Sequence, residues 1–461
     1  MMIYEGVLEM SVFRAYDIRG VYPTEINEDI AYGVGRAFVL FLKCKTVVIG
    51  RDMRLSSDSI FEALARGITD QGADVIDIGL CSTPMDYFTI AKYGYDSGIM
   101  ITASHNPKEY NGLKLSRAKA IPIGGDSGMK DVEALYNKHK GGSWPDAENK
   151  GTIIKKDIED DYVAHLLDFM GGKKLSNMKI AVDAANATGV IEFEHMKKLS
   201  DDTVEYIPLY MEIDGTFPNH EANPLKEENM KDVAKAVVDN KAHIGLAFDG
   251  DCDRAGFVDE DGKVVSADFI TALIARQFLL EKKGEKVLYD LRCSWVTKEE
   301  IEKAGGIPMM CKVGHAFIKR QLRDENAVFG GELAGHFYFR DNFFTDSGII
   351  AILQMLKYVS SAIKGGTTVS QLVDPMRKYF CTGEINTKVK DPDAILKDLE
   401  DNFTEGASLV SHLDGIKVEF DDYWYNVRKS NTEPVLRLIV EGRTKEVMEQ
   451  RRDELLNVIR G

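Results

Sequence analysis

The sequence has no pair of cysteines in the C-x-x-C spacing that zinc sites and redox motifs use. Its six cysteines are scattered, which argues against a disulfide framework and suits a reducing compartment. Long apolar runs are also missing: the most apolar stretch, 347–363, contains Gln354 and Lys357 and is short for a bilayer, so we expect a buried helix. The first residues carry Glu5 and Glu9 without a positively charged start, unlike a secretory signal. These absences predict a cytoplasmic location.

A surplus of positive charge is absent as well. The formal net charge is -16, and no run of basic residues interrupts it. A field of this sign repels nucleic-acid backbones and anionic lipid surfaces. We therefore expect neither a nucleic-acid nor a membrane partner, and an anionic substrate would have to be bound by a few arginines and lysines placed inside a cleft.

The length and the pattern of apolar residues predict several domains. With 461 residues the chain exceeds a single core, because domains usually hold about 100 to 200 residues. Three segments share one plan, in which an apolar strand is followed by an amphipathic helix, a glycine and a second strand. They begin at 46–52, 179–184 and 286–290, which indicates that whole α/β domains are repeated. In the first segment Ser57 is expected to cap the helix.

The C-terminal part differs in kind. Alternating apolar residues in 416–420, 423–427 and 435–440 predict antiparallel strands, and a final helix over 445–459 would cover them. Glycine-rich and polar clusters between these regions predict domain boundaries. The expected domains are residues 1–155, 156–257, 258–368 and 369–461.

One candidate site is the motif T-A-S-H-N-P (102–107). It follows the apolar stretch 97–101 and so stands at the C-terminal end of a strand, where open α/β sheets bind ligands. Asn106 and Pro107 favour a turn that would hold Ser104 on an exposed loop, with backbone N–H groups facing an anion. An ordinary surface turn is the alternative interpretation.

A second candidate site follows the strand 244–248, where Asp249, Asp251 and Asp253 alternate with other residues. Three like charges in one short loop repel one another unless a cation neutralises them, and hard oxygen ligands favour Mg²⁺ or Ca²⁺. With Glu260 the spacing matches an EF-hand calcium loop. The sixth position, however, holds arginine in place of glycine, and a strand precedes the loop in place of a helix. Mg²⁺ is therefore the preferred ion.

Two further motifs carry polar side chains between apolar segments. G-E-L-A-G-H-F (331–337) offers Glu332 and His336, which suit the binding of sugar hydroxyls and proton transfer, although a buried structural histidine is the alternative. R-K-S-N-T-E-P (428–434) offers donors suited to a phosphate, although a polar hairpin loop is equally compatible with its composition.

These motifs, together with F-R-A-Y-D-I-R-G (13–20) and in this order, resemble those of the α-D-phosphohexomutases, in the phosphomannomutase/phosphoglucomutase branch. The resemblance spans nearly the whole chain. It implies an α/β fold with three related mixed-sheet α/β domains plus a smaller C-terminal α+β domain around a central cleft. The four domains would carry, in turn, a phosphoserine loop, a metal-binding loop, a sugar-binding loop and a phosphate-binding loop.

The resemblance also implies an activity: interconversion of hexose 1-phosphate and hexose 6-phosphate, of mannose and/or glucose, through a phosphoserine and a 1,6-bisphosphate. Mg²⁺ would be the cofactor, hexose 1,6-bisphosphate the activator, and the enzyme a monomer or homodimer. The implied metal ligands are Ser104, Asp249, Asp251 and Asp253. The implied catalytic residues are Ser104, His105, Lys114, Arg19, Arg254 and His336. The implied substrate contacts are Tyr16, Arg292, His315, Glu332, Arg428, Ser430, Asn431 and Thr432.

Two residues depart from the family pattern. Ala334 stands where many members have serine, and Cys252 lies within the metal-binding loop. A phosphoglucosamine mutase, one alternative, would gain from a polar residue at the position of Leu333. A sugar-phosphate hydrolase or sensor is the other alternative, although a hydrolase has no use for a second phosphate-binding loop. The base that takes the hydroxyl proton, Lys114 or His336, stays open.

Overall fold

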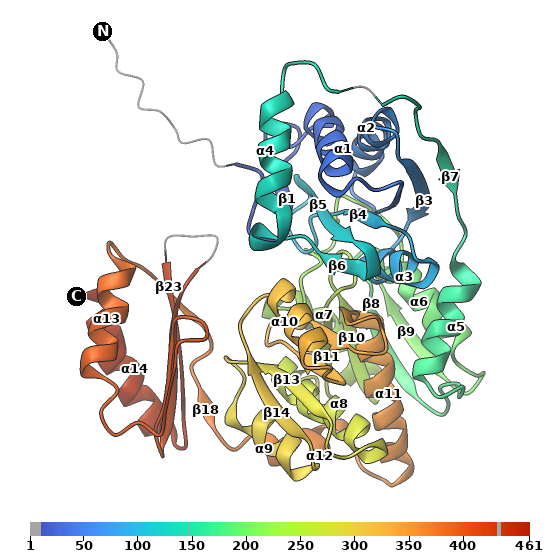
Figure 1. The fold of residues 1–461 in the computed structure, drawn as a ribbon. Helices are drawn as coiled ribbons and strands as arrows, with labels where there is room; N and C mark the ends of the chain where they lie inside the picture. Colours follow the sequence, from blue (N-terminus) through green and yellow to red (C-terminus); the bar gives the residue numbers. More distant parts are fainter. Residues whose placement is uncertain (1–10, 146, 431–434) are drawn as a thin grey trace. The chain divides into compact units, whose positions relative to one another are not determined.

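The computed structural model of the chain describes residues 11–145, 147–430 and 435–461. It divides into two compact units, Met1–Ile158 with Ile213–Pro218, and Glu159–Glu212 with Asn219–Gly461. The described residues form four β-sheets, three of them mixed and one antiparallel (Figure 1). No helix in this described part has the length and apolar character needed to cross a membrane.

The first unit is built on a seven-stranded sheet. Its strands are β1 (Ile18–Val21), β2 (Thr46–Arg51), β3 (Asp74–Leu80), β4 (Ser97–Ile101), β5 (Tyr110–Arg117), β6 (Ile121–Pro122) and β7 (Ile153–Lys155). Their order is β1-β5-β4-β2-β3-β7, with β6 paired to β5. Neighbours among β4, β2, β3 and β7 are parallel, whereas β5 pairs antiparallel with β4, β1 and β6.

Four helices cover this sheet. They are α1 (Glu28–Leu42), α2 (Ser57–Asp70), α3 (Thr83–Tyr93) and α4 (Lys130–His139). Alternate residues of a strand point to opposite faces. Val47 and Ile49 of β2 accordingly join the core beneath α1, α2 and α4, and Val48 joins the core beneath α3 (Figure 1). The first predicted strand–helix–strand segment is thereby confirmed.

Helix α2 begins differently from the sequence prediction. Ser56 is the N-cap residue and Ser57 is already helical, so the prediction that Ser57 caps the helix is wrong. The hydroxyl of Ser57 instead donates to Asp52 Oδ1 at 2.8 Å. Because Asp52 is buried, its oxygens need hydrogen-bond donors from the protein, and Ser57 supplies one.

The second unit contains two mixed five-stranded sheets with the orders β12-β11-β10-β8-β9 and β14-β13-β15-β16-β17. The first comprises β8 (Lys179–Asp183), β9 (Glu205–Leu209), β10 (Ile244–Phe248), β11 (Ala255–Val258) and β12 (Val264–Val265). The second comprises β13 (Lys286–Asp290), β14 (Ile307–Cys311), β15 (Phe329–Gly331), β16 (Phe337–Phe339) and β17 (Thr345–Asp346). In each, a central strand, β8 or β13, has a parallel neighbour on both sides. The predicted repetition of α/β domains is confirmed.

Helices of the second unit flank these sheets. They are α5 (Glu159–Phe169), α6 (Gly189–Lys198), α7 (Lys231–Asn240), α8 (Ala267–Glu281), α9 (Trp295–Lys303), α10 (His315–Asp324), α11 (Gly348–Lys364) and α12 (Val369–Val373). Val233 and Val237 of α7 pack with Ala181 of β8, and Ile318 of α10 packs with Leu288 of β13. Helix α11 is buried along most of its length, as the sequence predicts.

The C-terminal part of the second unit is an antiparallel sheet with helices on one side (Figure 1). Its strands are β18 (Phe380–Cys381), β19 (Ile385–Lys388), β20 (Leu409–Ser411), β21 (Ile416–Glu419), β22 (Tyr423–Lys429) and β23 (Val435–Gly442). Helices α13 (Pro392–Asn402) and α14 (Lys445–Arg460) bury Leu399, Met448 and Leu455 against it. The predicted α+β character is confirmed. All six cysteines are described, and none forms a disulfide.

Candidate active site

Three predicted motifs occupy equivalent places in the three mixed sheets. In each sheet, one parallel strand is followed in the chain by an antiparallel strand that pairs with it: β4 by β5, β10 by β11, and β15 by β16. The connecting loops carry Ser104, the three aspartates, and Glu332 with His336. All three loops leave the C-terminal end of a parallel strand, the usual ligand-binding edge of an α/β sheet.

The loop between β4 and β5, residues 102–109, is named the serine loop. Ser104 has a left-handed backbone (φ 52°), which a residue with a side chain adopts only when its surroundings impose it. Its N–H donates to Thr102 Oγ1 at 2.8 Å, and its Oγ lies 3.1 Å from His105 Nδ1. Ser104 is 2% exposed, whereas Pro107, Lys108 and Glu109 are exposed, so the loop is exposed as predicted but the serine side chain is buried. A buried arginine holds the loop in this conformation through hydrogen bonds.

That arginine is Arg54, in the loop that follows β2. It is buried, and its guanidinium donates to carbonyls along the serine loop and at the start of β5. The acceptors are Ser104 O at 2.8 Å, Asn106 O at 2.7 Å, Pro107 O at 2.7 Å and Tyr110 O at 2.9 Å. Its Nε also pairs with Asp52 Oδ2 at 3.1 Å, and its charged carbon lies 5.4 Å from the ring centre of Phe217. Because the guanidinium is planar and rich in donors, Arg54 fixes the loop's conformation.

Other predicted residues of the first unit lie around the serine loop. Arg19 of β1 donates from Nη1 to Asn106 Oδ1 at 2.6 Å and pairs with Asp17. Lys114 is buried on β5 opposite Met100 of β4. Tyr16 is half-buried just before β1. The structure therefore connects Arg19 to the serine loop directly, while Lys114 shares the strand that the loop enters.

The predicted metal-binding loop between β10 and β11 gathers three buried carboxylates. One carboxylate oxygen from each of Asp249, Asp251 and Asp253 lies within 4.8 Å of the other two. Arg254 donates its backbone N–H to Asp249 Oδ1 at 3.2 Å, and its Nε lies 3.9 Å from Asp249 Oδ2. Buried like charges at this spacing need a neutralising cation, and a set of oxygen donors suits Mg²⁺.

An EF-hand does not fit this loop. The loop joins two strands, β10 and β11, where an EF-hand joins two helices. Glu260, which would be the last calcium ligand, instead accepts hydrogen bonds from Ser370 N at 3.0 Å and Ser370 Oγ at 2.5 Å. Within the loop Cys252 is fully buried with its Sγ 3.4 Å from Thr188 Oγ1, and burial raises the pKa of its thiol well above the usual range.

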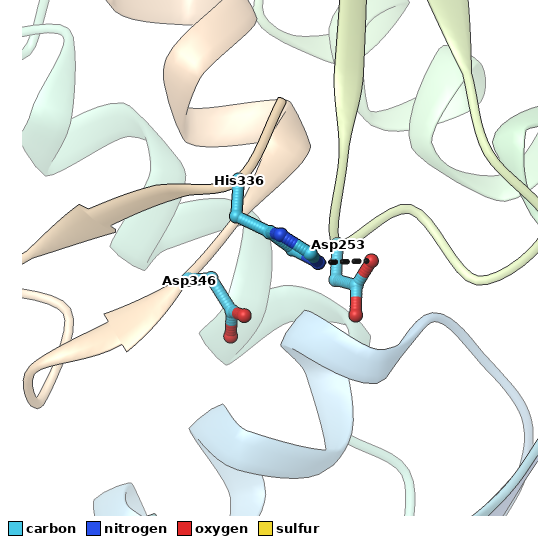
Figure 2. Close-up of side chains that lie close together, drawn as sticks. All are labelled: Asp253, His336 and Asp346. Atoms are coloured by element: carbon cyan, nitrogen blue, oxygen red, sulfur yellow. Dashed lines mark ion pairs between the residues drawn. The ribbon is translucent and has the colours of Figure 1, made fainter. Parts of the chain in front are cut away.

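A second buried cluster adjoins the metal-binding loop. Figure 2 shows Asp253, His336 and Asp346, which offer one ligand atom each within 4.8 Å of one another. His336 Nε2 lies 3.4 Å from Asp253 Oδ1, and Lys319 Nζ lies 2.7 Å from Asp346 Oδ1. Lys319 of α10 is buried as well, and its pairing gives the Asp346 carboxylate a basic partner within the protein. The sequence prediction missed this ion pair.

The loop between β15 and β16 also places Glu332 against His336. Glu332 Oε2 lies 2.9 Å from His336 Nδ1 and accepts from Tyr338 Oη at 3.1 Å. Burial and Arg254 act to lower the pKa of His336, but Asp253 and Glu332 outweigh them and raise it to about 9. Burial acts to raise the pKa of Glu332, but His336 and neighbouring arginines hold it well below its usual range. The pair thus favours imidazolium with carboxylate.

Arg292, in the loop after β13, connects Glu332 to the C-terminal sheet. Its Nη2 lies 2.6 Å from Asp290 Oδ2 and 3.3 Å from Glu332 Oε1, and its Nη1 lies 3.7 Å from Glu384 Oε2. His315 opens α10, with its ring centre 6.4 Å from that of His336. The predicted sugar-contacting residues Arg292, His315 and Glu332 are therefore grouped within the second unit.

The predicted phosphate loop follows β22. Arg428 is buried, and Arg437 on β23 donates from Nη2 to Ser430 Oγ at 3.1 Å. Both arginines pair with one carboxylate, that of Glu384. The sequence prediction missed Arg437 and Glu384. Asn431 and Thr432, also predicted here, lie outside the described residues.

In each mixed sheet an aspartate stands at the C-terminal end of a strand that has parallel neighbours on both sides, and it forms the same local turn. Asp52, Asp183 and Asp290 each accept, through Oδ1, the N–H of the residue two positions on, at 3.1, 2.8 and 2.7 Å respectively. Each also has a cationic or basic partner: Arg54, His220 at 3.0 Å, and Arg292. The spacing Asp-x-Arg was readable in the sequence for the first and third sheets and could have identified Arg54.

Comparison with known families covers most of the chain. Four family models match in succession, described as phosphoglucomutase/phosphomannomutase alpha/beta/alpha domain I (residues 10–142), domain II (160–262), domain III (266–379) and the C-terminal domain (384–458). The chain belongs to the phosphoglucomutase/phosphomannomutase family. The expected resemblance is thereby confirmed.

Relatives within the phosphoglucomutase/phosphomannomutase family align along the full length. A phosphomannomutase of Salmonella montevideo is 41% identical over 456 residues, covering 98% of this chain and 99% of its own. A protein named for phosphohexose mutases, from Xanthomonas campestris pv. campestris, is 40% identical over 460 residues, covering 98% and 100%. A crystal structure of a Burkholderia thailandensis family member superposes with a TM-score of 0.88 at 32% identity, covering 97% and 96%.

Proposed function

We propose that this chain is a phosphohexomutase that interconverts the 1-phosphate and 6-phosphate of a hexose, mannose and/or glucose. The observation that carries the proposal is the trio of buried carboxylates at the C-terminal end of β10, which supports a metal-assisted transfer to or from a charged group. The full-length relatives named as phosphomannomutases support the choice of reaction and of hexose phosphates as substrates.

Ser104 is the residue that carries the phosphoryl group in this proposal. The Oγ–P bond of phosphoserine breaks while a sugar hydroxyl forms a new O–P bond, giving a hexose 1,6-bisphosphate. The hydroxyl proton passes to a base, for which Lys114 and His336 are the candidates. The other phosphoryl group of the bisphosphate then returns to Ser104. The fixed backbone of the serine loop supports this role, because transfer depends on orientation.

Mg²⁺ is the proposed cofactor, and Asp249, Asp251 and Asp253 would hold it together with Ser104. The three buried carboxylates fit a hard divalent ion. Bound there, Mg²⁺ would neutralise charge on the transferring phosphoryl group. Arg254, next to these ligands, adds a guanidinium for phosphoryl oxygens, and His105, 3.1 Å from Ser104 Oγ, supports the serine. Arg19 supports the same loop.

Substrate binding is assigned to the second unit and Tyr16. Glu332 and His315 would contact sugar hydroxyls, and Arg292 joins them through its pairing with Glu332. Arg428, Ser430, Asn431 and Thr432 would bind the phosphate that does not react. Binding energy at that distant phosphate would orient the reacting end of the sugar.

The hexose is assigned from the sugar-binding loop. Leu333 offers no polar side chain that a phosphoglucosamine mutase would use. We therefore propose neutral hexose phosphates. The domain bounds 1–155, 156–257, 258–368 and 369–461, the cytoplasmic location and the monomer or homodimer stay predictions.

A coupled assay tests the proposed function. Mannose 1-phosphate, glucose 1-phosphate and glucosamine 1-phosphate are supplied separately with Mg²⁺ and a trace of hexose 1,6-bisphosphate, and each 6-phosphate is measured. The expected result is conversion of the mannose and glucose substrates that a chelator abolishes and added Mg²⁺ restores. Release of inorganic phosphate, or preference for glucosamine 1-phosphate, would contradict the proposal.

A further inference from the structure

Glu384 holds two arginines of the C-terminal sheet together. We name Arg428, Arg437 and Ser430 the phosphate clamp. Glu384 Oε2 lies 2.7 Å from Arg428 Nη2, and Glu384 Oε1 lies 2.8 Å from Arg437 Nη1. One carboxylate thus bridges two guanidinium groups, each through a separate oxygen.

This arrangement is the one that a phosphate would use. Guanidinium groups bind carboxylate and phosphate oxygens through the same planar set of N–H donors. The dianion of a sugar phosphate, with three terminal oxygens, could bridge the same two arginines and also reach Ser430. A carboxylate and a dianion cannot share these donors closely without strong repulsion.

We propose that Glu384 acts as an internal stand-in for the substrate phosphate, occupying Arg428 and Arg437 in the empty enzyme and leaving when a sugar phosphate binds. The inference rests on the phosphate-binding role proposed for Arg428. Glu384 therefore sets the affinity of the clamp, because each binding event must first break its two ion pairs.

The surroundings of Glu384 permit this exchange. Its side chain is 22% exposed, whereas that of Arg428 is 4% exposed, so the carboxylate can move toward solvent while Arg428 keeps its place. The preceding Gly383 has a left-handed backbone (φ 67°) with open space on its side-chain face. Arg292 Nη1, 3.7 Å from Glu384 Oε2, is a cation that can receive the displaced carboxylate.

One buried donor of the clamp also awaits an acceptor. Arg428 Nε has no hydrogen-bond partner within the ranges that the structure describes, although its Nη2 is bound by Glu384. A buried guanidinium nitrogen without an acceptor is costly, and a phosphate oxygen would satisfy it. Glu384 thus offsets the charge of the two arginines but leaves the Arg428 Nε donor for a phosphate oxygen to bind.

The deciding experiment measures phosphate affinity in wild type and Glu384→Gln. Gln keeps the shape of Glu384 but removes the charge that competes with phosphate. Inorganic phosphate is titrated calorimetrically, and KM for glucose 1-phosphate is measured in parallel. We expect both the phosphate Kd and the KM to fall by about tenfold in Glu384→Gln. An unchanged or raised Kd would overturn the proposal, since Glu384 would then only orient the arginines.

Asp393→Asn is the matched control. Asp393 pairs with Lys429, the residue after Arg428, and its side chain is 80% exposed. The substitution removes one negative charge near the clamp without touching Arg428 or Arg437, so phosphate affinity should stay at the wild-type value. An equal gain in Asp393→Asn and Glu384→Gln would attribute the effect to general charge and overturn the proposal.

Two further variants keep the test decisive. In an Arg428→Ala background, Glu384→Gln should improve phosphate binding less than it does in wild type, because only the pairing of Glu384 with Arg437 is left to break; an equal gain in both backgrounds would overturn the proposal. Glu384→Asp retains the charge but is too short to bridge both arginines, so it should also bind phosphate more tightly than wild type, even if Glu384→Gln fails to fold. Calorimetry needs no turnover, so absent mutase activity with tighter phosphate binding would contradict only the proposed function.

Discussion

The loops after β2 and β13 start from the same pattern, Asp-x-Arg, and use it differently. In the first sheet Arg54 donates to four backbone carbonyls that surround Ser104. In the third sheet Arg292 faces side-chain carboxylates, those of Asp290, Glu332 and Glu384. Backbone carbonyls cannot leave an arginine unless the chain itself moves, whereas carboxylate side chains can rotate away from it.

The difference shows how one fold serves two tasks. Around Arg54 the four carbonyl acceptors lie in the serine loop and at the start of β5, so the arginine holds the loop that carries Ser104 in one conformation. Around Arg292 the acceptors are three carboxylates, and two of them, those of Glu332 and Glu384, belong to the proposed sugar-binding and phosphate-binding regions, where a substrate would be able to replace them. A repeated arginine is thus a rigid support in one unit and an adjustable contact in the other.

The largest effect is expected from Ser104→Ala, which removes the group that the rigid loop presents. Turnover should fall by at least about 10³-fold, because no other residue is assigned to carry the phosphoryl group. Binding of glucose 6-phosphate, measured by calorimetry, should persist. Ser143→Ala, in an exposed loop of the same unit, is the control with unchanged activity. Full activity in Ser104→Ala would sink the phosphoserine mechanism.

Arg54→Ala should come next, since it leaves four carbonyls without their shared donor and removes the cation that pairs with the buried Asp52. We expect kcat to fall by about 10²-fold through misplacement of Ser104, and stability to fall by about 3 kcal/mol. Arg54→Lys should rescue little, because one ammonium group cannot reach all the acceptors. Both are measured by coupled assay and denaturant unfolding.

Arg51→Ala separates loop positioning from general stability. Arg51 ends β2 and pairs with Asp58 of α2 at 2.7 Å and with Asp77 of β3 at 2.9 Å. It should lower stability with little change in kcat. If Arg54→Ala behaves the same way, with kcat intact, the serine loop does not depend on Arg54 for catalysis.

Arg292→Ala should shift the effect from kcat to KM. Because Arg292 contacts replaceable carboxylates of the substrate region, its loss should raise KM for glucose 1-phosphate by about 30-fold and change kcat less. Steady-state kinetics beside Arg54→Ala provide the measurement. A fall in kcat as large as that of Arg54→Ala, at unchanged KM, would erase the proposed distinction between the two arginines.

The smallest effect is expected in the second sheet, where the aspartate at the strand end, Asp183, pairs with His220 and not with an arginine. Burial acts to lower the pKa of His220, but Asp183 outweighs it and raises the pKa above the usual 6.5. A raised folded-state pKa stabilises the protein below pH 6.5, and this stabilisation is lost as the pH rises through the folded-state pKa. His220→Gln should therefore be less stable than wild type by about 1 kcal/mol under acidic conditions, with a smaller gap under alkaline conditions. Thermal unfolding across that range is the check; a pH-independent gap would contradict it.

The sequence was sufficient for elements whose pattern is local. The alternation in 416–420 and the apolar strand before Asp249 predict the strands that the structure contains, and the rule that ligands bind at strand ends located Ser104 and the metal-binding loop. Loops between paired strands are short in sequence, so the clustering of their polar residues can be predicted without knowing how the sheets and helices pack.

Partners distant in sequence could not be predicted in this way. Arg54 precedes the carbonyl that it binds on Ser104 by 50 positions, and Glu384 precedes Arg428 by 44. A single glutamate before a short strand is common in solvent-exposed loops, so nothing in the local sequence distinguishes Glu384. Ser57 was misassigned for a related reason, since a local capping rule ignores the buried Asp52 that its hydroxyl binds.

The most direct test of the account is the site of phosphorylation. The purified enzyme is incubated with glucose 1,6-bisphosphate, and the modified residue is located by peptide mass spectrometry before and after addition of excess glucose 1-phosphate. We predict one phosphoryl group on Ser104, which is transferred to sugar when glucose 1-phosphate is added and is retained when a chelator is present. Phosphate on another residue, or sugar turnover with Ser104 never modified, would contradict it.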